Sequence, residues 1–147
     1  MADTRVQLEV EDWVRREWMP LRFGQQFFRE RVRLSSGGVC DFDAVSGDRE
    51  IAAAISTGGA LTAGGKYAVG KMMKIRADMY FLLLAVVERR LVILTEKDMY
   101  ERCKQDAQAG RVPVSIEFMH AEIPAELEAK LRDSRGRASD EGRQSRA

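Results

Sequence analysis

The chain is poor in the side chains that bind soft metals or form redox centres. Its 147 residues include one histidine, His120, and two cysteines, Cys40 and Cys103. A structural zinc site takes four Cys or His ligands, so a single copy of this chain cannot complete one. The cysteines lack CxxC spacing and indicate no disulfide framework, which favours a reducing, cytoplasmic location.

Long apolar runs are also missing. The longest, Met79–Val87, is far shorter than the roughly 20 residues that span a membrane. The N-terminal residues show no basic segment followed by an apolar one, so no signal peptide is expected. We therefore expect no membrane partner, and we interpret Met79–Val87 as the buried part of a core helix.

Neither sign of charge dominates. There are 24 Lys+Arg and 23 Asp+Glu, for a net charge of +1, so a uniformly basic nucleic-acid binder is not indicated, although a local patch stays open. The composition, 45% hydrophobic and 32% charged, is typical of a globular domain. We expect one domain over residues 1–132. The tail, 133–147, lacks apolar periodicity and is expected to be disordered.

Hydrophobic periodicity predicts alternating helices and strands. The expected elements are a helix over 7–31 broken near Pro20, strands over 31–35, 39–46 and 50–57, a helix over 66–87, a strand over 90–94, a helix over 95–109, a strand over 112–118 and a helix over 124–132. Three strands joined by tight turns favour antiparallel pairing, and later strands that alternate with helices favour parallel pairing. The predicted fold is α/β, a mixed sheet flanked by helices.

The glycine-rich sequence GGALTAGGKY superficially resembles a phosphate loop. A Walker A motif would need Gly where Ala60 stands, and Ser or Thr where Tyr67 follows Lys66. Nucleotide hydrolysis is therefore not indicated, and a loop before a helix is the simpler interpretation. Lys66, Lys71 and Lys74 gather at the start of that helix and are candidates for contacting a nucleic-acid backbone. A solvated helix face is the commoner explanation of such lysines.

Carboxylates are concentrated in the hairpin over 39–57. A turn centred on Gly47-Asp48 would pair Val45 with Glu50. One face of the hairpin would then carry Asp41, Asp43, Glu50, Ala52, Ala54 and Ser56. Neighbouring carboxylates repel unless they are solvated, paired or bound to a cation, and Mg²⁺ prefers such oxygen ligands. For Asp41 a solvent-facing position is the favoured interpretation.

The segment FDAVSGDREIAAAIST, Phe42–Thr57, resembles the hairpin that carries the motif of the PD-(D/E)XK, or restriction-endonuclease-like, superfamily. The resemblance covers about residues 7–118. It implies an αβββαβ core and an Mg²⁺-dependent nuclease site in which Asp43 binds the metal. The family often adds an acidic residue from the first helix, for which Glu30 is the candidate here.

Two family positions are not filled. The third-strand acidic residue and lysine fall on Ala54 and Ser56, which cannot ligate a metal or supply a fixed positive charge. The favoured interpretation is a catalytically degenerate domain that binds nucleic acid or a protein partner. The alternative is an active nuclease rebuilt with Glu50 as substitute ligand and a lysine from the next helix, Lys66, Lys71 or Lys74. That alternative needs two compensations at once, so whether the chain is an enzyme stays open.

A third hypothesis is a non-enzymatic protein that forms a homodimer. Its interface would use either Trp13 and Trp18 or Phe27 and Phe28. Large aromatic residues on a short amphipathic helix are more often part of the core.

Overall fold

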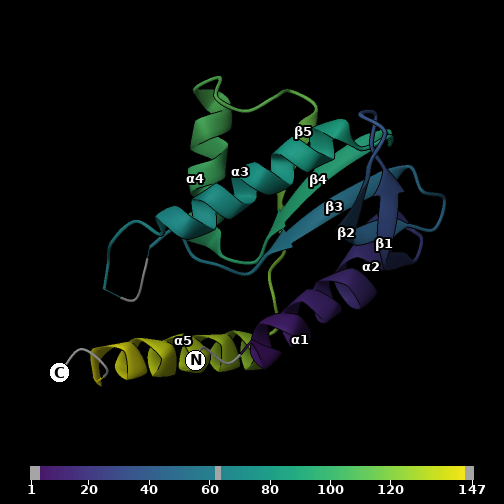
Figure 1. Ribbon diagram of the computed structural model, residues 1–147. Coiled ribbons are helices and arrows are strands. Elements are labelled where there is room, and N and C mark those ends of the chain that lie inside the picture. The colour runs from purple at the N-terminus through teal and green to yellow at the C-terminus, as the bar shows by residue number, and fades with distance from the viewer. Residues whose placement is uncertain (1–3, 62–63, 145–147) are drawn as a thin grey trace.

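The structure is a computed structural model that describes the backbone of residues 4–61 and 64–144 and the side chains of 4–61 and 64–134. A first helix, in three consecutive parts, precedes an alternation of strands and helices (Figure 1). The elements are α1 (Arg5–Trp13), the π-helical turn η1 (Val14–Trp18), α2 (Met19–Phe23), β1 (Phe27–Arg33), β2 (Val39–Ser46), β3 (Ile51–Ser56), α3 (Val69–Leu84), β4 (Arg89–Leu94), α4 (Lys97–Gln108), β5 (Ile116–His120) and α5 (Ala125–Gln144).

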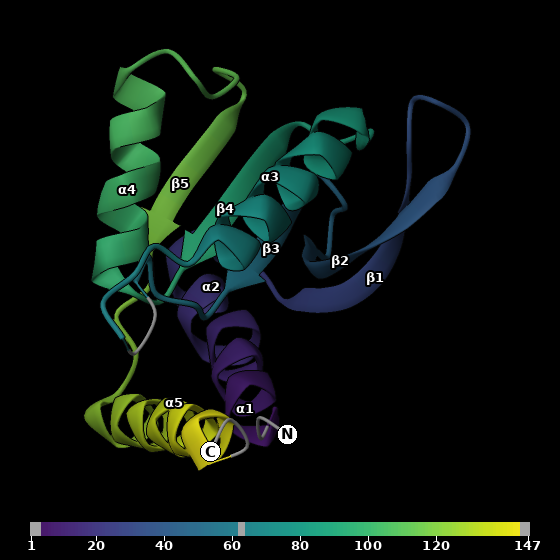
Figure 2. The ribbon, with the colours of Figure 1, turned by 60° about the vertical axis from the view of Figure 1, so that its left-hand side comes forward.

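The strands form one open sheet in the order β1-β2-β3-β4-β5. Pairing is antiparallel from β1 to β3 and parallel from β3 to β5. α3 and α4 cover one face, while the first helix and α5 lie side by side against the other (Figure 2). The predicted α/β fold, a mixed sheet flanked by helices, is confirmed.

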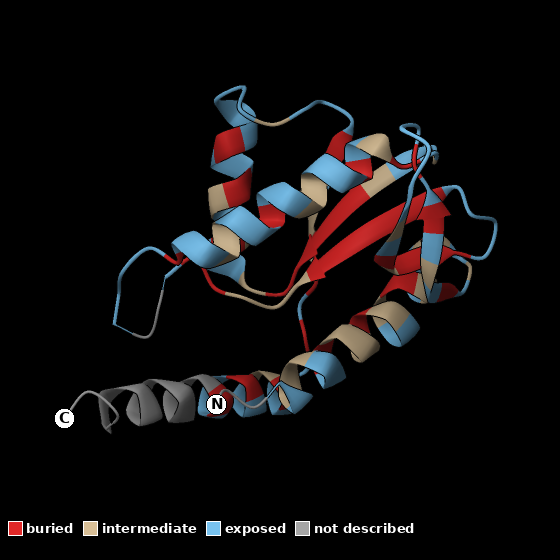
Figure 3. Cartoon of the chain, in the orientation of Figure 1, coloured by how far each residue is buried: buried red, intermediate tan, exposed pale blue. Residues whose placement is uncertain are grey.

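The central strands explain the burial pattern, in which the sheet is the most buried layer (Figure 3). In β3, Ala52 and Ala54 pack beneath α3, whereas Ile51, Ala53 and Ile55 pack against the first helix and α5. Such alternation follows from the two-residue period of a strand. β4 is covered on both faces as well, which is why it reads as a continuous apolar run.

The prediction of one helical region over 7–31 with a break at Pro20 is wrong in two ways. The helix runs through Pro20 and ends at Phe23, because Gly24 adopts a left-handed conformation with φ of 70°. The wider π-helical turn η1 ends at Trp18, two residues before Pro20, where a regular helix would suffer a ring clash and a lost hydrogen bond. Phe27 then starts β1 with its side chain buried.

The later elements match the prediction more closely. β2 has the predicted bounds, and β3, β4 and α4 differ from theirs by one or two residues. The strand expected over 112–118 begins only at Ile116, because Pro113 lacks an amide proton and Val114 is fully exposed. α5 continues beyond 132 to Gln144. The disorder expected for 133–147 stays a prediction, and residues 145–147 lie outside the described residues.

Several large apolar residues considered above have defined places. Trp13 and Trp18 are half-buried against the cluster beneath the first helix, and Phe27 lies within it. Phe28 is half exposed. In the described part of the chain, no helix has the length and apolar character to cross a membrane.

Candidate functional site

The β2–β3 hairpin has a different register from the predicted one. Val45 lies opposite Ala52, not Glu50, and Ala44 lies opposite Ala53. The pairing is therefore displaced by two residues, a shift that by itself keeps each side chain on its predicted face. The predicted common face of the hairpin is nevertheless wrong, because the alternation of β2 is interrupted at Asp43 and Ala44.

Side chains in the turn cause this displacement. The backbone amide of Ile51 donates to Ser46 Oγ at 2.9 Å, and the Ser46 hydroxyl donates to Asp48 Oδ1 at 2.7 Å. The same carboxylate accepts the amide of Glu50 at 3.0 Å. Arg49 adopts a left-handed φ of 63°. These side-chain hydrogen bonds lengthen the turn, so Arg49 and Glu50 precede the paired part of β3.

A β-bulge then redirects the middle of β2. Two of its residues, Asp43 and Ala44, lie opposite the single residue Arg29 of β1. As a result Phe42 and Val45 both pack beneath α3, although regular alternation would put them on opposite faces. Bulges commonly re-aim a side chain next to a functional site.

The redirected Asp43 side chain is fixed between β3 and α1. Its Oδ2 accepts the backbone amide of Ile55 at 2.8 Å. From α1, the Glu11 carboxyl group forms a hydrogen bond with the Asp43 carboxyl group. Arg15 of η1 donates to the Asp43 carbonyl oxygen at 2.9 Å. Helix and bulge together bring two carboxyl groups into contact.

This contact changes the acidity of Glu11. Burial, and then the neighbouring charge and hydrogen bond of Asp43, raise the pKa of Glu11 from 4.5 to about 7. The guanidinium groups of Arg15, at 3.4 Å, and Arg29, at 3.7 Å, oppose that rise. Below neutral pH, Glu11 is therefore protonated, and the hydrogen bond with the Asp43 carboxyl group favours this form. Two carboxyl groups this close share a proton or bind a cation.

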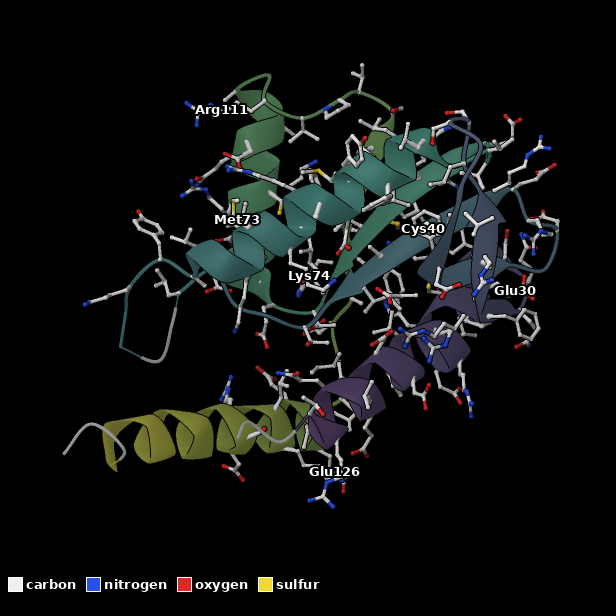
Figure 4. The ribbon with its side chains drawn as sticks, in the orientation of Figure 1. Glu30, Cys40, Met73, Lys74, Arg111 and Glu126 are labelled. Atoms are coloured by element: carbon white, nitrogen blue, oxygen red, sulfur yellow. The ribbon has the colours of Figure 1, made fainter. Side chains whose placement is uncertain are left out.

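The carboxyl pair lies in a cavity of about 400 Å³ at the carboxyl end of β3, between α1 and α3. We call it the carboxylate–lysine pocket. Its charged and polar lining comprises Thr4, Gln7, Glu11, Arg29, Asp43, Ser56, Thr57, Lys71, Lys74 and Asp78. Figure 4 shows Lys74 on the side of α3 that faces α1. Acidic and basic groups from four elements thus meet in one cavity.

The two lysines are held by different means. The stem of Lys71 lies against Gly58, where an added Cβ would come within 2.5 Å of Lys71 Cδ. Lys74 donates from Nζ to the Asp78 carboxylate at 3.0 Å. Burial raises the pKa of Asp78 despite this ammonium partner. Gly58 therefore leaves the space that Lys71 occupies.

Four of the predicted site residues come together here. Asp43, Ser56, Lys71 and Lys74 all line the carboxylate–lysine pocket. Ser56 is half-buried at the end of β3, and its carbonyl accepts the amide of Thr95 at 3.1 Å. The three-residue spacing of the lysines puts both on the pocket side of α3, as expected.

The other predicted residues lie elsewhere. Glu30 lies on β1 and pairs with Arg49, away from the lysines (Figure 4). Glu50 precedes β3 at its opposite end, about 16 Å along the strand from Ile55 by the usual rise per residue. Lys66 lies in the loop before α3 and is not among the residues lining the pocket.

Sequence reasoning missed Glu11, Arg29 and Asp78. Glu11 follows Val10, which is fully buried, so it lies at the edge of the apolar stripe of α1. Asp78 follows Lys74 by four residues, a spacing that indicates an ion pair. Neither signal reveals that both carboxylates approach β2.

Comparison of the chain with protein-family models, with curated protein sequences and with solved structures finds no match.

Proposed function

We propose that the chain is a restriction-endonuclease-like protein, a metal-dependent phosphodiesterase that acts on nucleic acid with rearranged site residues. The observation that carries this proposal is the meeting of the Glu11–Asp43 carboxyl pair with Lys71 and Lys74 in one pocket. The order helix, three strands, helix, strand supports the proposed family, as does an aspartate on the second strand.

The pocket offers both compensations that an active site would need. The two family positions on β3 are occupied by Ala54, which is buried and has no carboxylate, and by Ser56, which has no charge. Glu11 provides a second carboxylate from α1 instead. Lys71 provides an ammonium group from α3 and lines the same cavity as Asp43. The required chemistry is thus distributed over helices and does not depend on β3.

The carboxyl pair fits a hard divalent cation. Glu11 and Asp43 would hold it in place of the proton that Glu11 carries. Mg²⁺ commonly uses one or two protein carboxylates and keeps several waters, so a pair suffices. When bound, such an ion stabilises charge on a phosphoryl oxygen and makes water more acidic. Lys71 and Lys74 would bind the phosphate, and Asp78 would orient Lys74.

Cleavage tests the proposal directly. Supercoiled plasmid and single-stranded DNA are incubated with the protein in Mg²⁺ and in Mn²⁺. We expect the wild type to cleave, and Asp43→Asn and Lys71→Ala to lose on the order of 100-fold in rate, as when one group that stabilises developing charge is removed. Lys104→Ala is the matched control, since Lys104 is exposed on α4 outside the pocket. Its rate should equal that of the wild type.

Cation binding provides a second readout. Calorimetric titration with Mn²⁺ should show saturable binding that Asp43→Asn abolishes and Lys104→Ala leaves unchanged. Binding should strengthen as pH rises towards 8, because the Glu11 proton competes with the ion. Absence of both cleavage and Mn²⁺ binding in folded protein would overturn the enzymatic proposal.

A second candidate is nucleic-acid binding without cleavage. The residues at the third-strand positions, Ala54 and Ser56, favour it, because neither supplies a catalytic group. Salt-dependent DNA binding that requires Lys71, in protein that never cleaves, would identify this candidate.

A further inference from the structure

A second cavity, of about 470 Å³, adjoins the first turns of α3. We call it the aromatic–arginine cavity. Its lining includes Tyr67, Val69, Met73, Arg76 and Arg102. Met73 lies on the side of α3 that faces α4, whereas its neighbour Lys74 lies on the side of the carboxylate–lysine pocket (Figure 4). The two cavities therefore flank the same part of one helix, which is about 10–12 Å across.

Tyr67 is an exposed aromatic residue on a fixed backbone. It is 70% exposed. It forms an isolated bridge with Leu61, and the next amide, of Ala68, donates to the Ala60 carbonyl at 2.9 Å. The Ala60 amide in turn donates to the Asp98 carboxylate at 3.1 Å. An aromatic ring that contacts solvent and is attached to a backbone held in place is a ready surface for stacking.

The charge around Tyr67 is positive. The Arg102 guanidinium lies over its ring, with Cζ 5.5 Å from the centroid, and Asp106 lies 3.7 Å from Arg102 Nε. Arg76 contributes a second guanidinium. Among the described residues, none that lines this cavity carries a carboxylate. An aromatic ring beside arginines is the usual arrangement for a stacked base and its phosphate.

We infer that the aromatic–arginine cavity binds an unpaired nucleobase, and that the substrate is therefore a single-stranded nucleic acid or an unpaired end. This inference rests on the proposed function, because the same strand would cross the start of α3 into the carboxylate–lysine pocket. The base stacks on Tyr67 beside Met73, and Arg76 and Arg102 contact the adjoining phosphates. Bases within an intact duplex are stacked on one another and cannot reach Tyr67 without being flipped out.

The test separates base stacking from phosphate binding. Fluorescence anisotropy compares a labelled single-stranded oligothymidine with an abasic oligonucleotide of equal length and charge, and with a duplex. For the wild type we expect about tenfold tighter binding of the base-containing strand, within the range for one base on an aromatic side chain. Tyr67→Ala should remove that difference, and Tyr67→Phe should keep it.

Tyr80→Ala is the matched control. Tyr80 is an exposed tyrosine within α3 that does not line either cavity, so its loss should leave the difference intact. Equal binding of both single strands by the wild type, with binding still dependent on Lys71, would overturn the stacking site and leave the proposed function standing. Tighter binding of the duplex than of the single strand would also overturn the stacking site and leave the proposed function standing. Absence of binding to all three nucleic acids would overturn both.

Discussion

The two ends of β3 both carry charged side chains, but they use them in opposite ways. Near Ile51, Arg89 and Arg90 of the neighbouring strand β4 both have complementary partners. Arg90 donates to the carbonyls of Leu82 and Ala85 at 2.8 and 2.9 Å, and Arg89 forms a two-bond pair with Glu117 at 3.0 Å. The Arg90 contacts give hydrogen-bond donors to carbonyl groups at the C-terminal end of α3, and the Arg89–Glu117 pair joins the parallel strands β4 and β5.

At the Ser56 end, like charges are brought together. Glu11 and Asp43 touch, and the pKa of Glu11 rises because burial and its neighbour both disfavour the carboxylate. Two lysines share the same cavity. Groups whose pKa is shifted by burial and a specific neighbour, in a cavity, are candidates for a functional site. The comparison therefore assigns the first end to stability and makes the second end the candidate site of the proposed chemistry.

Arg90→Met should give the largest effect and sharpens the stability side of this comparison. The change keeps an apolar stem but removes two charged hydrogen bonds to the end of α3. We expect a loss of about 2 kcal/mol in the free energy of unfolding, measured by urea titration. Glu117→Gln is the control, because its pair with Arg89 is nearly half exposed and should contribute less than about 1 kcal/mol. Equal losses would contradict the comparison.

Gly58→Ala probes the chemical side without removing a charge. The new methyl group would displace the Lys71 stem. We expect roughly tenfold weaker binding of single-stranded DNA, or about 1.4 kcal/mol, with little change in urea stability. Gly38→Ala, at a glycine with open space around it, should behave as the wild type. Unchanged binding by Gly58→Ala would show that the placement of Lys71 does not matter.

Glu11→Gln should give the smallest effect, and its sign depends on pH. Because the pKa of Glu11 is raised from 4.5 to about 7 on folding, the native state binds the proton more tightly. Stability from this group is present below pH 4.5 and is lost as pH rises to 7. The neutral amide avoids that loss. The full shift would correspond to about 3 kcal/mol at about 1.36 kcal/mol per pKa unit, but solvent screens this partly exposed pair, so the variant should gain only about 1 kcal/mol at pH 8 and nothing near pH 4.5.

Thermal unfolding at both pH values measures this gain. Glu17→Gln on η1 is the matched control, because Glu17 is exposed and outside the pocket. A gain that is the same at both pH values would mean that the carboxyl pair is not the cause.

Much of the sheet is predictable from local patterns. The alternation along 39–46 and the continuous apolar run over 90–94 follow from burial on one or two faces. Pro20 misleads because a π-helical turn, which leaves no mark in the sequence, accommodates it. Phe27 and Phe28 misleadingly continue the helical spacing, although the helix ends at Phe23, before the left-handed Gly24.

The site is less predictable, since it depends on which elements approach one another in the folded chain. Asp43, Lys71 and Lys74 can be selected from a hairpin and a helical spacing. The contact of Glu11 with Asp43 requires the path of α1 across β2, and the hairpin register requires the Ser46 hydroxyl to replace a backbone acceptor. Neither follows from residue type and spacing alone.

The bulge in β2 also changes which residues of that strand face α3, the even-numbered or the odd-numbered ones. Before it, even-numbered residues such as Cys40 and Phe42 pack with α3, and after it the odd-numbered Val45 does. Asp43 occupies the point at which the parity changes. Its direction is therefore set by the number of residues in the strand, so a substitution at Asp43 changes the chemistry while leaving the site in place. Deleting Ala44 would restore the regular alternation and turn the same carboxylate to a different environment.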